Sequence, residues 1–160
     1  MALATGEFIA LVDHDDVLAD DALYWIAREI QLRPCSNLVY SDEDKIDESG
    51  RRSSPHFKPS FNIDLLLAYN FISHLGVYRT ETVRSVGGFR IGLEGSQDHD
   101  LALRVVQHSV IEQIVHIPRV LYHWRMHEAS TAIDPGSKDY TTKRGLRAVQ
   151  EYLNHETNSG

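Results

Sequence analysis

An apolar run meets three carboxylates in the stretch Phe8-Ile9-Ala10-Leu11-Val12-Asp13-His14-Asp15-Asp16. A continuous run of this kind is typical of a buried parallel strand, and ligand sites in open α/β sheets lie just beyond the carboxyl ends of such strands. Crowded carboxylates repel one another unless a cation or hydrogen-bond donors compensate, and Mg²⁺ is bound through one or two carboxylates plus substrate phosphates. The stretch therefore predicts a strand that ends at a site for a divalent metal and a diphosphate.

A simpler interpretation of the acidic turn remains open at this point. Asp is common in turns and at helix N-caps, so the three carboxylates could serve local loop structure only. Asp16 in particular is expected to be a turn or cap residue.

Length and composition indicate one globular domain. The chain has 160 residues, 42% of them hydrophobic, and a formal net charge of −7. The acidic balance disfavours nucleic acid as a partner. Cys35 is the one cysteine, which excludes an intramolecular disulfide and a cysteine cluster for zinc. Because no apolar run approaches the roughly 20 residues of a membrane span and the start lacks a basic leader pattern, we expect a soluble, unprocessed chain.

Apolar periodicity predicts strands and helices that alternate along the chain. Expected strands cover residues 37–40, 74–78, 110–117 and 120–124, and expected helices cover residues 21–33, 62–69, 98–107 and 138–155. Pro118-Arg119 predicts a hairpin or a sheet-switching bend between the last two strands. Residues 45–61 lack an apolar period and predict a long exposed loop. The fold class is therefore α/β.

Five ordered motifs carry a family resemblance. They are the stretch from Gly6 to Asp16, Tyr40-Ser41-Asp42-Glu43-Asp44-Lys45-Ile46-Asp47, Gly87-Gly88-Phe89, Gly95-Ser96-Gln97-Asp98-His99-Asp100-Leu101, and Tyr122-His123-Trp124-Arg125-Met126-His127. In order and spacing they resemble the bacterial family-2 nucleotide-sugar glycosyltransferases. The resemblance implies that residues 1–135 form part of a family-2 catalytic domain, with a GT-A-like mixed sheet flanked by helices. This part would be an incomplete nucleotide-binding Rossmann-like half. Residues 136–160 are expected to form a C-terminal helical extension.

The resemblance implies a donor site around the acidic turn. Asp15 would be a direct ligand of Mg²⁺ or Mn²⁺, and Asp13 would contact the nucleotide ribose or a metal-bound water. His127 is expected to bind the metal or the diphosphate, and Arg125 to help with phosphate charge. Such a cation would neutralise the leaving diphosphate of a nucleoside-diphosphate sugar.

Asp98 occupies the position of the family's catalytic base, with Gln97 beside it where many relatives carry Glu. An inverting transfer needs a carboxylate that takes the proton of the acceptor hydroxyl. A structural alternative is that Asp98 caps the following helix. Asp100 lies about 200° around that helix from Asp98, so it is expected to be a surface charge.

Four further residues are candidates for contacts with substrate. Asp42 and Asp44 follow the second strand and could contact donor sugar or acceptor hydroxyls, or else cap and solubilise the loop. Asn70 and His74 precede the next strand and are expected to line the acceptor cleft.

One departure from the family concerns the start of the chain. Family members usually have additional strand–helix units before the Gly6-Glu7-Phe8 segment, including those that hold the base. We therefore expect the isolated chain to bind nucleotide-sugar weakly and to have low or no activity. A sheet edge left unpaired by those strands predicts self-association.

The sequence keeps three classes of function open. The first is an inverting glycosyltransferase, or a fragment of one, that acts on a glycan or lipid-linked acceptor in cell-surface polysaccharide synthesis. The alternatives are an inactive module that binds carbohydrate or nucleotide, and a metal-dependent phosphoester hydrolase. The family implies a cytoplasmic location, peripheral to the inner face of the membrane.

Overall fold

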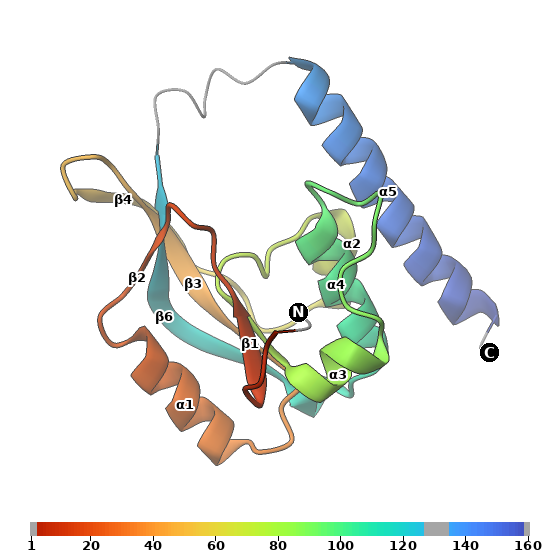
Figure 1. Ribbon diagram of the computed structural model, residues 1–160, viewed down its shortest axis with the longest axis horizontal. Coiled ribbons are helices and arrows are strands. Elements are labelled where there is room, and N and C mark those ends of the chain that lie inside the picture. Colours follow the sequence, from red (N-terminus) through yellow and green to blue (C-terminus); the bar gives the residue numbers. More distant parts are fainter. Residues whose placement is uncertain (1–2, 127–134, 159–160) are drawn as a thin grey trace.

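The computed structural model describes residues 3–126 and 135–158, with the side chains of the last helix described from residue 142 to residue 157. One mixed sheet forms the centre of the molecule (Figure 1). Its strands are β1 (Phe8–Leu11), β2 (Val17–Leu18), β3 (Leu38–Ile46), β4 (Arg52–His56), β5 (Gly76–Arg79) and β6 (Ile114–Arg125). The order is β1-β5-β3-β6-β2, and β4 pairs with β3. Because β3 and β6 run parallel and the other pairs are antiparallel, the expected α/β mixed sheet is confirmed.

Helices cover both faces of this sheet. They are α1 (Ala22–Leu32), α2 (Ile63–Ala68), α3 (Thr80–Ser85), α4 (Gln97–Gln107) and α5 (Pro135–Asn158), and a short 3₁₀ turn spans Ile111–Gln113. Helix α1 lies on one face, whereas α2, α3 and α4 lie on the other, with α5 beyond α4 (Figure 1). No helix in the described ranges is both long and apolar enough to cross a bilayer.

Two apolar cores join the layers. Ala22 and Ile26 of α1 pack with Val39, Val77 and other buried side chains of one sheet face. The opposite core contains side chains from the sheet, from α2, α3, α4 and α5, and from the segment between α2 and β5: Leu38, Tyr40, Leu66, Phe71, Tyr78, Val83, Leu101, Val105 and Ala148. Since Ala148 of α5 is buried in this second core, the last helix packs against the rest of the fold. The division into residues 1–135 and 136–160 stays a prediction.

The first strand differs from the sequence-based expectation. β1 pairs antiparallel with β5, and three of its four residues are partly buried rather than fully buried. An apolar run alone therefore gave the strand but not its direction, because the direction depends on a partner far away in the sequence. Within the described residues β1 has a partner on one side only, so the predicted self-association concerns this edge.

Strands β3 and β4 replace the expected long loop. β3 continues through its acidic residues to Ile46, and β4 returns antiparallel beside it, so an exposed loop over residues 45–61 was wrong. The connection is a tight turn in which Asp47 Oδ1 accepts hydrogen bonds from the backbone N–H groups of Ser49 and Arg51, both at 2.9 Å. Gly50 has a φ of 81°, a conformation that glycine adopts at little cost.

Strand β6 is continuous where two strands had been expected. Its register with β3 passes from Ser41↔Ile117 to Asp42↔Val120, so Pro118 and Arg119 form a bulge. Pro lacks the N–H that a ladder needs, and a bulge accommodates it without ending the strand. The predicted hairpin or sheet-switching bend was therefore wrong, because β6 stays paired with β3 on both sides of the bulge. The long β6 carries its last residues back to the acidic turn after β1.

Candidate active site

The acidic turn after β1 is held by the end of β6. The hydroxyl group of Tyr122 donates to Asp16 Oδ2 at 2.5 Å and accepts from the backbone N–H of Asp13 at 3.1 Å. The backbone N–H of Arg125 donates to Asp16 Oδ1 at 2.7 Å. Asp16 therefore fixes the turn, as predicted for a turn residue. Burial and the hydrogen bond to Asp16 raise the pKa of Tyr122 above its ordinary value, so its hydroxyl stays a donor.

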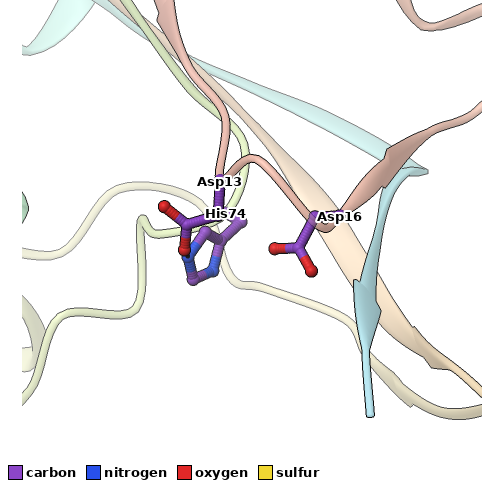
Figure 2. Close-up of side chains that lie close together, drawn as sticks. All are labelled: Asp13, Asp16 and His74. Carbon is purple, nitrogen blue, oxygen red and sulfur yellow. Dashed lines mark ion pairs between the residues drawn. The ribbon is translucent and has the colours of Figure 1, made fainter. Parts of the chain in front are cut away.

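Asp13, Asp16 and His74 form a cluster at this turn. Each offers a ligand atom within 4.8 Å of the others. Figure 2 shows the Asp16 carboxylate directed toward the imidazole, with Asp13 on the turn above it. His74 Nε2 lies 3.4 Å from Asp13 Oδ2. Carboxylate oxygens and an imidazole nitrogen are suitable ligands for Mn²⁺, and carboxylates also suit Mg²⁺. The residues present therefore fit a divalent cation.

The charge around His74 is strongly negative. Burial lowers the pKa of this imidazole, but the hydrogen bond and charge of Glu43, together with Asp13 and Asp16, outweigh burial and raise it. The surroundings thus favour a positive charge at this point of the site.

A cavity of about 540 Å³ lies next to this cluster. Its lining comes from the end of β1 and the turn after it, from β5 and the segment before it, and from the α3–α4 connection and the start of α4: Ala10, Leu11, Val12, Asp13, Ser73, His74, Gly76, Tyr78, Phe89, Gly95, Gln97 and Asp98. Asp13 and Asp98, which are remote in the sequence, therefore face the same space. The predicted candidates His74 and Gln97 line it as well.

Asp98 is held in the first turn of α4 by a neighbouring amide. Asn70 Nδ2 donates to Asp98 Oδ2 at 2.8 Å. The N-cap position of α4 is occupied by Ser96, so the alternative that Asp98 is the N-cap residue was wrong. Asn70 Oδ1 is buried and has no hydrogen-bond partner among the described residues. Burial and the charge of Asp98 raise the pKa of Tyr78, which lies on the cavity wall.

The other predicted donor-site residues lie around the turn. Arg125 Nε donates to the backbone carbonyl of Asp15 at 2.7 Å. The side chain of Asp15 lies 3.7 Å from His14 Nδ1, and neither Asp15 nor Arg125 lines the cavity. Their roles as metal and phosphate ligands stay predictions, and His127 lies outside the described residues. The side chain of Gln97 accepts a hydrogen bond from the backbone N–H of Gly95 at 2.5 Å.

Asp42 and Asp44 have partners within the sheet. Asp42 is 3% exposed, and its Oδ1 accepts from the backbone N–H of Lys58 and lies 2.8 Å from His116 Nε2. Asp44 is 4% exposed and lies 2.6 Å both from His123 Nδ1 and from Arg52 Nε. The geometry gives both carboxylates a structural role, and their contact with substrate stays a prediction.

Sequence reasoning missed two residues near the site. Glu43 projects from β3 toward His74, and Lys58 lies behind it with a side chain that is 0% exposed. Lys58 stood in the segment that was interpreted as an exposed loop, and Glu43 stood in the acidic segment at the end of the second expected strand. The alternation along β3 is a signal that separates Glu43 from Asp42 and Asp44, but no local pattern marks Lys58 as buried.

The comparisons with known proteins agree with this fold. The chain is 46% identical over 155 residues to the uncharacterized protein y4gI of Sinorhizobium fredii, and 39% identical over 152 residues to the O-antigen biosynthesis protein RfbC of Myxococcus xanthus. It is 22% identical over 157 residues to a chondroitin synthase of Pasteurella multocida. These matches cover 97%, 95% and 98% of the chain but 17%, 12% and 16% of the relatives. The chain thus spans less than a fifth of the length of each of these three relatives. No family model matches it.

Two solved structures share the fold. S. aureus TarS (residues 1–349) superposes with a TM-score of 0.58 at 19% identity, over 78% of this chain and 37% of TarS. The mannosyltransferase PcManGT from Pyrobaculum calidifontis, in complex with GDP-Man and Mn²⁺, superposes with a TM-score of 0.52 at 16% identity, over 98% and 52%. The fold is of the GT-A type. Together with the relatives, it identifies the chain as a family-2, GT-A glycosyltransferase-like protein.

Proposed function

We propose that the chain carries the catalytic site of an inverting glycosyltransferase. It would transfer a sugar from a nucleoside-diphosphate sugar to a hydroxyl of a glycan or lipid-linked acceptor. The observation that carries this proposal is the shared cavity, with Asp13 at one side and Asp98 at another. A metal-and-diphosphate group and a proton acceptor are the two parts that such a transfer requires.

The donor side is assigned to the acidic turn. Asp13, Asp16 and His74 would hold a divalent cation, with Asp15 and His127 as the ligands that the family resemblance adds. A cation bound there neutralises negative charge on the leaving diphosphate. Arg125, anchored through Asp15, would add positive charge on the same side.

The acceptor side is assigned to Asp98. Its carboxylate would take the proton from the acceptor hydroxyl while that oxygen forms a bond to the anomeric carbon, and the bond from that carbon to the diphosphate breaks with its electron pair leaving on the phosphate. Asn70 donates to the carboxylate and so fixes its position in the wall of the cavity. Attack from the face opposite the diphosphate inverts the anomeric configuration.

The comparisons support this proposal at a coarser level. The names of two relatives place them in O-antigen and chondroitin synthesis, and one structural neighbour was solved with GDP-Man and Mn²⁺. Extending these properties to this chain predicts a nucleotide-sugar donor, a cation cofactor and a role in polysaccharide synthesis.

Calorimetric titration with nucleoside diphosphates, with and without Mn²⁺, tests the donor side. We expect binding that requires Mn²⁺ and that weakens in Asp13→Asn, whereas Asp64→Asn on the exposed start of α2 serves as the matched control. Equal nucleotide binding without any cation would contradict the proposal and favour a simple binding module.

Release of nucleoside diphosphate in the presence of acceptors tests the role of Asp98. We expect Asp98→Asn to lower the transfer rate by about 10²–10⁴-fold, the usual contribution of a general base, and to leave nucleotide affinity unchanged. Hydrolysis of phosphoesters without acceptor, insensitive to Asp98→Asn, would instead indicate the hydrolase alternative.

A further inference from the structure

Lys58 places a positive charge in the interior, behind the cavity. Its side chain is 0% exposed, and its Nζ has four oxygen atoms within hydrogen-bond distance. These are Glu43 Oε2 at 3.2 Å and the backbone carbonyls of Ile72, Ser73 and His74 at 3.1, 3.3 and 2.6 Å. An ammonium group has three donors, so these acceptors satisfy it fully. A buried ammonium is tolerated only with such compensation.

Besides the direct hydrogen bond from Lys58 to the His74 carbonyl, Glu43 forms a second connection between the ammonium and His74. Its Oε2 accepts the backbone N–H of His74 at 2.6 Å, while Lys58 binds the carbonyl of the same residue. Both polar groups of the His74 backbone are thereby held by one ion pair. The same carboxylate oxygen lies 3.7 Å from His74 Nδ1, on the inner edge of the ring.

The outer edge of the His74 ring faces the acidic turn. Nε2 lies 3.4 Å from Asp13 Oδ2, and the ring stacks on Tyr122 with centroids 4.9 Å apart. Tyr122 in turn donates its hydroxyl to Asp16. A continuous set of contacts therefore runs from the buried ammonium to both carboxylates of the cluster.

We propose that Lys58 is a positioning residue that, together with Glu43, fixes the backbone of residues 72–74 so that His74 presents Nε2 to Asp13 and Asp16, and that it thereby sets the divalent-cation affinity of this cluster. This inference rests on the proposed function for its cation. Residues behind metal ligands orient them, and their loss typically lowers metal affinity by about 10–100-fold. Lys58 would act through the backbone of His74 rather than through the imidazole ring of that residue.

Lys58→Met in the full chain tests the proposal, because methionine keeps the buried volume and removes the ammonium. The first measurement is the nuclear Overhauser effect between the imidazole of His74 and the ring of Tyr122, without metal. The second is the Mn²⁺ dissociation constant, measured by electron paramagnetic resonance. We expect the Overhauser contact to be lost and the Mn²⁺ dissociation constant to rise by about tenfold or more.

Two further variants complete the experiment. Lys143→Met removes an exposed lysine of α5 and is expected to change neither measurement. If Lys58→Met does not fold, the double variant Lys58→Met/Glu43→Gln removes both charges, leaves no unpaired carboxylate in the interior, and is expected to show the same two effects.

The outcomes separate the two proposals. An Overhauser contact that persists in the Lys58 variants overturns the positioning role, and so does an unchanged Mn²⁺ affinity. Absence of Mn²⁺ binding to the wild-type chain would overturn the cation site of the proposed function, and with it the proposal that Lys58 sets the cation affinity. The Overhauser measurement would still decide whether Lys58 orients His74.

Discussion

Asp100 is a buried carboxylate that organises the segment after α3. It is 1% exposed, and both Arg90 and Arg104 pair with it. Arg104 also donates to the carbonyls of Val86 and Gly88, at 2.6 and 2.7 Å. The expectation of a surface charge was wrong, because the arginines that pair with Asp100 cover the face of α4 opposite Asp98.

Asp100 does not line the cavity, and we expect Asp100→Ala to destabilise the fold. Removing one partner from a buried ion pair typically costs about 3–5 kcal/mol, and we expect the lower end because Arg90 is partly exposed. Urea unfolding measures the loss, and Asp64→Ala at the exposed start of α2 is the control, with an expected change below about 1 kcal/mol. Equal stabilities of the two variants would show that the pairing contributes nothing.

At the scale of elements, the sequence predicted those that carry their own apolar pattern. Helices α1, α2 and α4 were predicted within a few residues, because each contributes an apolar face to a core. The length of β3 was not predictable, since its buried carboxylates depend on His116 and His123 of β6 for partners. Long-range pairing of this kind leaves no local trace in the sequence.

The candidate site likewise contains residues that the sequence predicted and residues that it did not. The positions of Asp13 and Asp98 in the lining of one cavity were anticipated from motifs in which each residue follows a recognisable strand or begins a helix. Lys58 and Glu43 were not anticipated, because a charged residue within a charged segment predicts solvent exposure. Their burial follows from the hairpin of β3 and β4, which the sequence pattern did not show.

Close packing in β5 gives a prediction at the same scale. A Cβ atom at Gly76 would lie 2.8 Å from the hydroxyl oxygen of Tyr78, so Gly76→Ala must displace that ring from the cavity wall. We expect a loss of about 1–3 kcal/mol in the free energy of unfolding. A Cβ at Gly145 of α5 meets only Ser96 Oγ at 3.7 Å, so Gly145→Ala is expected to stabilise by about 0.5–1 kcal/mol.

Thermal and urea unfolding of both glycine variants provide the measurement. Both substitutions add one methyl group, but the expected changes in the free energy of unfolding have opposite signs, so the comparison is decisive. A stabilised Gly76→Ala variant would contradict the packing of Tyr78 against β5.

At the scale of the whole molecule, charges in the interior connect the sheet to the segment before β5 that lines the cavity. β3 lies between β5 and β6, and its Glu43 reaches across to the segment before β5 through Lys58 and His74. The cavity is therefore built on a polar layer that has to stay ionised. Stability and site geometry are expected to respond together to acidification.

Glu43 determines the direction of that response. Burial raises its pKa, but the hydrogen bond from His74 and the charges of Lys58 and His74 outweigh burial and lower it below the ordinary value of 4.5. A carboxyl whose pKa is lower in the folded state contributes its full stability above the unfolded-state pKa, and loses it as pH falls through the folded-state pKa. Acidification below about pH 4.5 should therefore remove the contribution of Glu43.

Glu43→Gln tests this directly by urea unfolding at pH 6, 5, 4 and 3. At pH 6 and pH 5 we expect the variant to be less stable by about 3 kcal/mol, since it leaves the buried Lys58 ammonium without its counterion. Below pH 4.5 the difference should shrink, because protonated Glu43 leaves the wild-type ammonium in the same state as in the variant. A difference that stays constant from pH 6 to pH 3 would show that the carboxylate of Glu43 does not carry the acid sensitivity.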